Sequence, residues 1–362
     1  MSLELRSVTK VVGRETHIDS VSLMLESGSL NVLLGPTLSG KTSLMRLMAG
    51  LDRPTSGELM VDGKDCTGVP VRRRSVAMVY QQFINYPNLS VYENIASPLR
   101  AAGAPAPEIE RKVGEAAELL KLTEMLDRTP QELSGGQQQR TALARALVKE
   151  ADLVLLDEPL ANLDYKLREE LRAELPRLFA ETGAIFVYAS TEPSEALLLG
   201  GNTAALHEGQ VTQFGPTIDV FRAPNSLLTA QVFSDPPMNT IPVAKSDGQV
   251  RMGDALAIPA TGTLADLDSG NYTIGFRPNH LFLHRPGPDA VAISGTVAVT
   301  EITGSESFVH VDFADQRWVA LAHGVHDLTI DKPVELFLDP ARFFVFDASG
   351  AIAAAPRRVD AM

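Results

Sequence analysis

Apolar and polar positions alternate near the start of the chain and then change their spacing. Over residues 3–8 and 18–25, apolar residues recur about every second position, which predicts antiparallel strands. Residues 30–34 form a short apolar run, and apolar residues within 42–51 recur at helical spacing. A glycine-containing stretch lies between them, so a strand, a glycine-rich loop and a helix are predicted in that order.

Helical spacing dominates the next part of the chain, from about residue 87 to 150. Residues 109–122 carry apolar positions three or four apart among charges, which predicts a helical insert. Two continuous apolar runs, 153–156 and 184–188, are typical of buried strands and flank a charged helical stretch at 165–179. Strands that alternate with helices predict a parallel sheet.

The pattern changes again near residue 235, where a proline-containing break precedes short alternating runs. We therefore expect a first domain at 1–235 and a second at 236–362. The second is expected to be a small β-barrel or barrels, with residues 351–362 frayed. The runs that predict its strands are 274–276, 296–302, 308–313, 318–322, 334–338 and 343–346.

Composition limits the classes of function. Of the 362 residues, 44% are hydrophobic and 21% are charged, which is typical of a globular protein with an ordinary core. The formal net charge of -13 argues against nucleic acid as a partner, because such binding relies on Lys and Arg. Cys66 is the single cysteine, so an intramolecular disulfide is excluded. Without a signal-like start or a long apolar run, the chain is expected neither to be exported nor to cross a membrane.

The glycine-rich stretch carries the first chemistry. Residues 35–42 read GPTLSGKT and match the phosphate-loop pattern, in which backbone N–H groups surround phosphate oxygens. Lys41 is suited to neutralising the β- and γ-phosphates, and the Thr42 hydroxyl to binding Mg²⁺. A chance glycine turn is the alternative, and the strand before and helix after count against it. The predicted nucleotide-binding residues are Gly35, Pro36, Thr37, Leu38, Ser39, Gly40, Lys41, Thr42 and Ser43.

Two acids end the apolar run at 153–156, and the carboxyl end of a parallel strand is where such sheets bind ligands. Asp157 is suited to holding Mg²⁺. Glu158 is suited to polarising the water that attacks the γ-phosphate. Acids after a strand can instead cap a helix, but the upstream phosphate loop favours catalysis.

These residues and three further motifs follow one another as they do in the ATPase subunits of ABC transporters. The further motifs are Gln81 in VYQ, LSGGQQQR at 133–140 and Leu163-Asp164. The resemblance covers about the first 235 residues. It implies an α/β phosphate-loop NTPase (ABC ATPase) domain with a helical subdomain at about 87–150, and ATP hydrolysis with ATP and Mg²⁺.

The resemblance also implies that two such subunits pack head to tail. ATP would lie between one subunit's phosphate loop and the other's signature, whose helix start directs donors at the γ-phosphate. Asp164 would link the two ATP sites, Gln81 would reach Mg²⁺ or the attacking water, and residues 82–91 would form much of the groove for a helix of a membrane subunit. Without the other motifs, Ser134 would be interpreted as a helix cap and the glycines after it as a turn. The signature residues are Ser134, Gly135, Gly136 and Gln137.

Residues 275–278 and 301–313, with the break at 236–239, resemble the accessory OB-like barrel of maltose-type carbohydrate-importer ATPases. Within that group, residues 28–50, 78–87 and 188–201 resemble one of the two ATPase subunits of bacterial glycerol importers. This implies import of a small polyol or sugar, with glycerol favoured. The implied partners are a second ATPase subunit, two transmembrane permease subunits and, indirectly, a periplasmic or extracellular solute-binding protein. The implied location is peripheral, on the cytoplasmic face of the inner membrane.

Two residues depart from the ABC pattern. Thr191 stands where most members have a histidine that contacts the γ-phosphate, and a hydroxyl is shorter and carries no positive charge. Val12 stands where an aromatic residue usually stacks on adenine, and His17, expected in a loop, is given no role. We expect slower hydrolysis, weaker nucleotide binding and a heterodimer with unequal sites, although Glu158 is retained.

Three alternatives stay open. The first is a homodimeric ATPase of an importer for another solute, in which Thr191 acts through water. The second is a soluble ABC ATPase outside transport, which needs tandem cassettes or a long coiled coil, whereas this sequence has one phosphate loop and one signature. The third is a regulatory binding protein, against which the retained Lys41, Asp157 and Glu158 argue.

Overall fold

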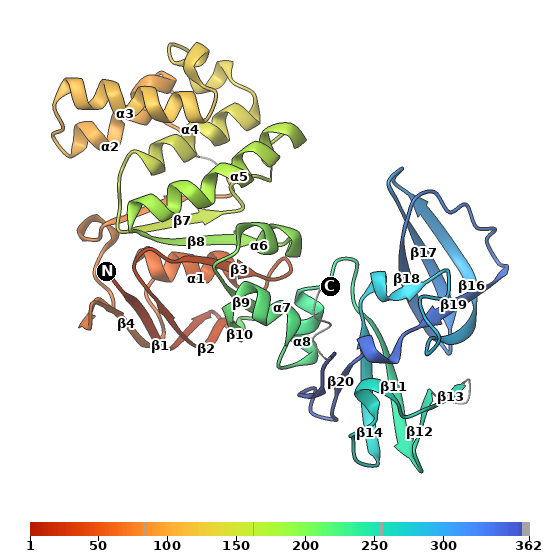
Figure 1. The fold of residues 1–362 in the computed structure, drawn as a ribbon. Coiled ribbons are helices and arrows are strands. Elements are labelled where there is room, and N and C mark those ends of the chain that lie inside the picture. The colour runs from red at the N-terminus through yellow and green to blue at the C-terminus, as the bar shows by residue number, and fades with distance from the viewer. Residues whose placement is uncertain (83, 162, 253–255, 357–362) are drawn as a thin grey trace. The chain divides into compact units, whose positions relative to one another are not determined.

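Residues 1–356, apart from 83, 162 and 253–255, are described by the computed structural model of the chain (Figure 1). The chain divides into two units, Met1–Val220 and Phe221–Met362. Each unit has a buried apolar core of its own.

The division at residue 220 lies earlier than the boundary near 235 that the sequence pattern suggests. Backbone hydrogen bonds explain the difference. The Leu227 N–H donates to the Gly350 carbonyl (2.9 Å), and the Ile352 N–H donates to the Asn225 carbonyl (3.0 Å). The stretch that follows residue 220 is therefore tied to the end of the second unit.

The alternating start of the chain folds as an antiparallel sheet. Its strands are β1 (Leu3–Val12), β2 (Glu15–Leu25), β4 (Ser56–Val61) and β5 (Lys64–Asp65). Their order is β2-β1-β4-β5. Leu3 pairs with Leu25 and Leu5 with Leu23, and because side chains alternate along a strand, these apolar residues share one buried face.

The predicted parallel sheet is confirmed. It consists of β3 (Leu30–Leu34), β6 (Val76–Val79), β7 (Leu153–Asp157), β8 (Ile185–Ser190), β9 (Asn202–His207) and β10 (Gln210–Pro216). The order is β10-β9-β3-β8-β7-β6, and all neighbours are parallel except β10 and β9. The carboxyl ends of β3, β6, β7 and β8 therefore meet at one edge, where the phosphate loop, Gln81, Glu158 and Thr191 follow.

Helix α1 (Lys41–Ala49) packs between the antiparallel and the parallel sheet. Leu44 and Leu47 of this helix are fully buried in one cluster with Leu3 of β1 and Leu33 of β3. This packing fixes the start of α1 at the edge where the chemistry gathers. The other helical elements between and after these strands are η1 (Val71–Arg73), α5 (Tyr165–Thr182), α6 (Pro193–Leu199) and α7 (Thr217–Arg222).

A group of helices lies apart from the sheets in the stretch where a helical insert is predicted (Figure 1). It comprises α2 (Val91–Ala101), α3 (Ala106–Leu119), η2 (Thr123–Met125), η3 (Pro130–Glu132) and α4 (Gly135–Leu147). Helix α2 starts at a capping box, in which Ser90 and Glu93 exchange side-chain to backbone hydrogen bonds. Across the described part of the chain, no helix combines the length and apolar character needed to cross a membrane.

The second unit is rich in strands. Its elements are α8 (Leu227–Val232), β11 (Asn239–Ser246), β12 (Gln249–Met252), β13 (Leu256–Pro259), η4 (Gly262–Leu264), β14 (Gly270–Phe276), η5 (Pro278–His280), β15 (Leu281–Phe282), β16 (Val291–Ile302), β17 (Glu306–Phe313), β18 (Gln316–His323), β19 (Pro333–Leu338), η6 (Pro340–Arg342), β20 (Phe344–Phe346) and β21 (Ile352–Ala354). They form sheets in the orders β13-β12-β11-β14-β20-β21 and β15-β19-β16-β17-β18. Trp318 and Phe276 meet edge to face in the core, with ring centroids 4.9 Å apart.

Two features of the second unit escape the hydrophobic pattern. Strand β11 buries Asn239 and Lys245 on the same face as Ile241 and Val243, so polar residues interrupt the apolar alternation. The expected frayed end is partly wrong, because β21 pairs with β20. Residues 357–362 lie outside the described residues.

Candidate active site

The phosphate loop follows β3 and leads into α1. A Cβ on Gly35 would lie 2.4 Å from the Leu206 carbonyl oxygen, and one on Gly40 would lie 2.9 Å from the His17 carbonyl oxygen. Gly40 also has a φ of 102°, which favours glycine. The Ser39 hydroxyl is buried and has no hydrogen-bond partner within the described part of the chain. A closely folded backbone and an unpaired buried hydroxyl fit a loop built for phosphate oxygens.

Lys41 lies under this loop and is 6% exposed. Its Nζ donates to the carbonyl oxygens of Gly35 (2.7 Å) and Pro36 (2.9 Å). Burial lowers the pKa of Lys41, while the charges of Glu158 and Asp157 oppose that shift. The ammonium group is thus held at the loop by backbone oxygens and faces two carboxylates.

Two predicted Mg²⁺ ligands are in contact. The Thr42 hydroxyl donates to Oδ2 of Asp157 at 2.8 Å, which joins the start of α1 to the end of β7. Burial raises the pKa of Asp157, and the hydrogen bond from Thr42 and the charge of Lys41 counteract it. A hydroxyl and a carboxylate side by side are the hard oxygen donors that Mg²⁺ prefers.

Glu158 and Gln81 form the second contact of the cleft. The Gln81 side-chain N–H donates to Oε2 of Glu158 at 2.9 Å, and the amide oxygen of Gln81 stays available as a ligand. Burial raises the pKa of Glu158, and Lys41 opposes the shift. The Glu158 backbone has a φ of 48° and its N–H donates to the Ala189 carbonyl at 3.1 Å, so its position depends on the neighbouring strand β8.

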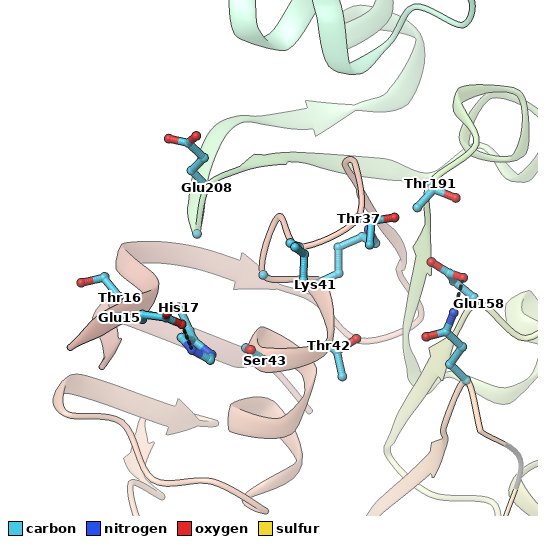
Figure 2. A pocket seen from close by; sticks show the side chains of 14 residues that line it. Glu15, Thr16, His17, Thr37, Lys41, Thr42, Ser43, Glu158, Thr191 and Glu208 are labelled. Atoms are coloured by element: carbon cyan, nitrogen blue, oxygen red, sulfur yellow. Dashed lines mark hydrogen bonds and ion pairs between the residues drawn. The ribbon is translucent and has the colours of Figure 1, made fainter. Parts of the chain in front are cut away.

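A cleft of about 770 Å³ joins these groups. Figure 2 shows Thr37, Lys41, Thr42, Glu158 and Thr191 on one side, and Glu15, Thr16, His17 and Glu208 on the other. The lining residues are Glu15, Thr16, His17, Thr37, Leu38, Gly40, Lys41, Thr42, Ser43, Gln81, Glu158, Thr191, Glu208 and Gly209. The predicted catalytic residues Glu158, Gln81 and Thr191 are therefore brought together.

The structure corrects the expectation for His17. This residue lies in strand β2 rather than in a loop, and it lines the cleft. Val12, by contrast, is outside the lining residues, pairs with Glu15 across the β1–β2 hairpin and is 50% exposed. No local sequence signal marks His17, Glu15 or Glu208, because their place in the cleft comes from the pairing of β2 and the β9–β10 turn.

The signature lies at the start of α4 and outside this cleft. Ser134 is the N-cap, its hydroxyl oxygen accepts the Gln137 N–H at 3.4 Å, and the Gln137 side chain accepts the Ser134 N–H at 2.9 Å. Gly135 and Gly136 form the first turn. Asp164 caps α5 by accepting the Leu167 N–H at 3.0 Å. Ser134 and Asp164, which are predicted to act across a dimer, are thus helix caps within one chain. Neither residue lines the cleft beside the phosphate loop.

Comparison with known proteins assigns both parts of the chain. The family model described as ABC transporter matches residues 18–161, and the model described as TOBE domain matches residues 274–346. Among solved structures, the dimeric post-hydrolysis structure of the ATP-binding cassette MJ0796 bound to ADP and Pi matches with a TM-score of 0.55 and 29% identity. The match covers 59% of this chain and 98% of that one. These matches confirm the fold class, an ABC ATPase domain followed by a β-rich, OB-like domain.

Curated relatives match almost the whole chain. The xylose/arabinose import ATP-binding protein XacK of Haloferax volcanii is 37% identical over 321 residues, which cover 86% of this chain and 84% of that protein. The sn-glycerol-3-phosphate import ATP-binding protein UgpC of Vibrio vulnificus is 35% identical, over 91% and 89%. The trehalose/maltose import ATP-binding protein MalK of Thermococcus litoralis is 34% identical, over 95% and 97%. The chain therefore belongs to the ABC-transporter family and is an ATP-binding, ATP-hydrolysing protein of the carbohydrate-importer group.

Proposed function

We propose that this chain powers import of a small polyol or sugar, with glycerol favoured, through a membrane ABC transporter in which it pairs with a second, different ATPase subunit. The observation that carries the proposal is the convergence of Lys41, Gln81, Glu158 and Thr191 on one cleft beside the Thr42–Asp157 pair. The names of the relatives, all import ATP-binding proteins, support the coupling to uptake.

Each side chain has a distinct part in hydrolysis. Lys41 and the α1 N-terminus bind the β- and γ-phosphates of ATP, because both present positive charge to them. Glu158 accepts the proton of the attacking water, and Gln81, bonded to Glu158, orients that water. Thr191 offers a hydroxyl near the γ-phosphate. Developing charge on the transferred phosphoryl group is thereby stabilised by fixed donors.

The residues at the end of β7 and the start of α1 fit a Mg²⁺ ion. Thr42, Asp157 and Gln81 would supply a hydroxyl, a carboxylate and an amide oxygen; Thr42 and Gln81 line the cleft, and Asp157 is hydrogen-bonded to Thr42. A Mg²⁺ ion held there would neutralise phosphate charge. Asp157 holds Thr42 in place for this role.

A second cleft supports the proposed contact with a permease subunit. It has a volume of about 440 Å³ and is lined by apolar residues of α2, α4 and β6 together with Tyr80, Tyr86, Arg145 and Lys149. Tyr86 is 51% exposed and stacks under the Arg145 guanidinium at 5.0 Å. An apolar hollow with a few polar groups suits an inserted helix end. Tyr80 lines this hollow, and its neighbour Gln81 lines the ATP cleft. A permease helix bound in the hollow would therefore be linked to the catalytic residues through adjacent positions of the chain.

The pairing with a different ATPase subunit rests on Thr191 and Val12. Thr191 lines the cleft with a neutral hydroxyl where the family pattern has an imidazole, and Val12 offers no aromatic ring to adenine. The signature that this chain presents to its partner keeps an intact capping box. One ATP site of the assembly is therefore weaker than the other, and the partner's phosphate loop completes the stronger site with this chain's signature.

Purification of the intact membrane complex through a tag on this chain tests the assembly. We expect mass spectrometry to find two different ATPase subunits in equal amounts. Two copies of this chain would contradict the heterodimer, as would robust, cooperative ATPase activity of the isolated chain.

Uptake assays test the solute and the enzyme role. Cells that lack this chain should fail to accumulate labelled glycerol and should recover with the wild-type chain. Xylose and maltose uptake serve as the matched controls, and a loss of either in place of glycerol would reassign the solute. A Glu158→Gln variant that restores full uptake would contradict Glu158 as this chain's catalytic base.

A further inference from the structure

A buried carboxylate lies next to the loop that carries Thr191. Glu195, in α6, has a side chain that is 8% exposed. Its Oε2 accepts the Ser190 hydroxyl at 2.5 Å and the Tyr188 hydroxyl at 3.3 Å. Its Oε1 accepts Nη2 of Arg172 at 2.9 Å. Donors from β8 and α5 thus surround a charge that the hydrolysis steps do not use.

Ser190 transmits this constraint to the loop. Its hydroxyl donates to Glu195 and, at the same oxygen, accepts the backbone N–H of Glu192 at 2.9 Å. A hydroxyl has one proton and two lone pairs, so both bonds form together. The Ser190 hydroxyl oxygen therefore links the two neighbours of Thr191, Ser190 and Glu192, and connects both to Glu195.

The loop is also tied to α5. Nη2 of Arg172 donates to Oε2 of Glu192 at 2.9 Å, and Arg168 contacts the other oxygen of Glu192 at 3.4 Å. Arg168 also donates to the Ala161 carbonyl at 3.1 Å, just before Asp164 begins the helix. Arg168 therefore connects the loop of the ATP cleft to the segment that precedes Asp164, the proposed dimer element.

A network of this kind contributes more to geometry than to stability. Burial of a carboxylate is unfavourable unless it is paired and fully hydrogen-bonded, and an apolar side chain of the same size often gives equal stability. Burial, together with the charge of Glu195, raises the pKa of Tyr188 well above its usual range. The Tyr188 hydroxyl therefore keeps its proton and remains a donor to Glu195.

We infer that Glu195 is a positioning residue for Thr191: through Ser190 it holds the threonine hydroxyl at the phosphate end of the cleft. The inference rests on the proposed role of Thr191 in hydrolysis. The threonine side chain is shorter than the imidazole of the family pattern and has fewer torsions to adjust. A shift of the loop backbone therefore displaces the Thr191 hydroxyl by nearly as much as the backbone itself. A misplacement of about 1 Å can cost a large factor in rate, and a short side chain cannot compensate for it.

A double-mutant cycle in the intact transporter complex tests the inference. Glu195→Gln keeps the size of the side chain but removes the charge that fixes Ser190 and Arg172. We expect kcat for ATP at the site built on this chain's phosphate loop to fall about tenfold with KM nearly unchanged, since the change affects orientation of the reacting groups. Thr191→Ala should lower kcat to a similar degree. The double variant should be no slower than Thr191→Ala alone, because a positioning residue has no effect once its target is gone.

Two further variants separate positioning from folding. Ser190→Ala leaves Glu195 bonded to Arg172 and Tyr188, and it should reproduce the kcat loss of Glu195→Gln even if that variant folds poorly. Glu169→Gln is the matched control, because Glu169 bonds the same Arg172 at 2.8 Å from a half-exposed helix position. Its activity should stay at the wild-type level.

The outcomes distinguish the inference from the proposed function. Additive losses in the double variant would overturn the inference, as would unchanged kcat in Glu195→Gln and Ser190→Ala while Thr191→Ala is slow. Unchanged kcat in Thr191→Ala would overturn the role of Thr191 itself, and the inference with it. Non-additive losses with unaltered melting temperatures would support both.

Discussion

Lys41 and Lys245 are both buried lysines that donate to backbone carbonyls, yet their surroundings differ. Lys41 holds the phosphate loop and shares its cleft with Glu158. Lys245, in β11 of the second unit, donates to the carbonyls of residues 264, 265 and 267. A lysine ammonium group is the proposed phosphate-binding charge in the first unit, whereas in the second unit it links a strand to a loop.

The contrast extends to the whole of each unit. In the first, buried charges gather at the carboxyl ends of parallel strands, where Asp157 and Glu195 lie within reach of polar partners. In the second, the largest buried side chains are the rings of Trp318, Phe276 and Phe343. We therefore expect substitutions in the first unit to change turnover and those in the second to change stability.

The largest effect is expected from Lys41→Met. Loss of the ammonium group should lower kcat/KM for ATP at the site built on this chain's phosphate loop by on the order of 1,000-fold, because charge stabilisation in the transition state is lost. The melting temperature should change little. Lys64→Met, at an exposed position of β5, is the control and should keep full activity. Hydrolysis at this chain's own site at a tenth of the wild-type rate or faster in Lys41→Met would contradict the role of Lys41.

Lys245→Met should show the reverse pattern. Three backbone carbonyls, one of them buried, lose their donor, and we expect the second unit to lose about 3 kcal/mol of unfolding free energy. The single tryptophan, Trp318, lies in this unit, so its fluorescence during urea unfolding measures the change. ATPase activity should persist, and Lys332→Met, at an exposed position, should alter neither property. Equal stability of Lys245→Met and wild type would refute the cross-link.

Acid should weaken the second unit through His280. Burial, with the charges of Arg342 and Arg277, lowers the pKa of His280 to about 4 from 6.5. The unfolded chain therefore binds the proton more readily, and stability falls as the pH drops from 6.5 to 4, with no further loss below. After allowance for partial exposure, the effect is about 2 kcal/mol.

The control for this titration is His280→Gln, which cannot be protonated in this range. Urea unfolding of both proteins, followed by Trp318 fluorescence at several pH values, isolates the histidine from the carboxylates that titrate nearby. The difference between wild type and variant should change between pH 6.5 and 4. A constant difference would show that His280 titrates alike in the folded and unfolded states.

The smallest effect is expected from Leu38→Gly in the phosphate loop. Leu38 is 95% exposed and has a φ of 68°, a left-handed conformation that strains leucine. Glycine relieves the strain but loses more backbone entropy, so a net gain of about 0.5 kcal/mol in the first unit is expected by calorimetry. Leu38→Ala keeps the strain and should gain nothing. A destabilised Leu38→Gly would mean that the leucine side chain has a packing partner.

Much of the ATP cleft could be predicted because its residues follow strands directly. The carboxyl ends of parallel strands meet at one edge, so the phosphate-loop pattern around Lys41 and the apolar strand before Asp157 and Glu158 predict that these residues share a site. The separation of the signature from these residues within one chain was also implied, by the resemblance to a head-to-tail dimer.

What the sequence does not show depends on contacts between distant segments. His17 faces the cleft because of the pairing of β2, and no pattern around it differs from that of an ordinary strand. Glu195 and Arg172 lie 23 residues apart on different helices. Glu195 belongs to the stretch 188–201, but nothing in the sequence gives it a role, and Arg172 belongs to no named motif. Strand β11 was missed because its buried face includes Asn239 and Lys245.

The hydroxyl group of Ser134 can accept one hydrogen bond through its oxygen and donate another through its proton. Its oxygen accepts the Gln137 N–H and so begins helix α4, which needs only a lone pair. Its proton is not used in that bond, and in the proposed dimer the hydroxyl would donate a hydrogen bond to a phosphate oxygen of the partner's ATP. Aspartate would start the helix as well, yet it has no proton to give and would repel the phosphate. Folding alone would accept several residues here, whereas folding together with ATP recognition narrows the choice to a side chain that accepts and donates at the same atom.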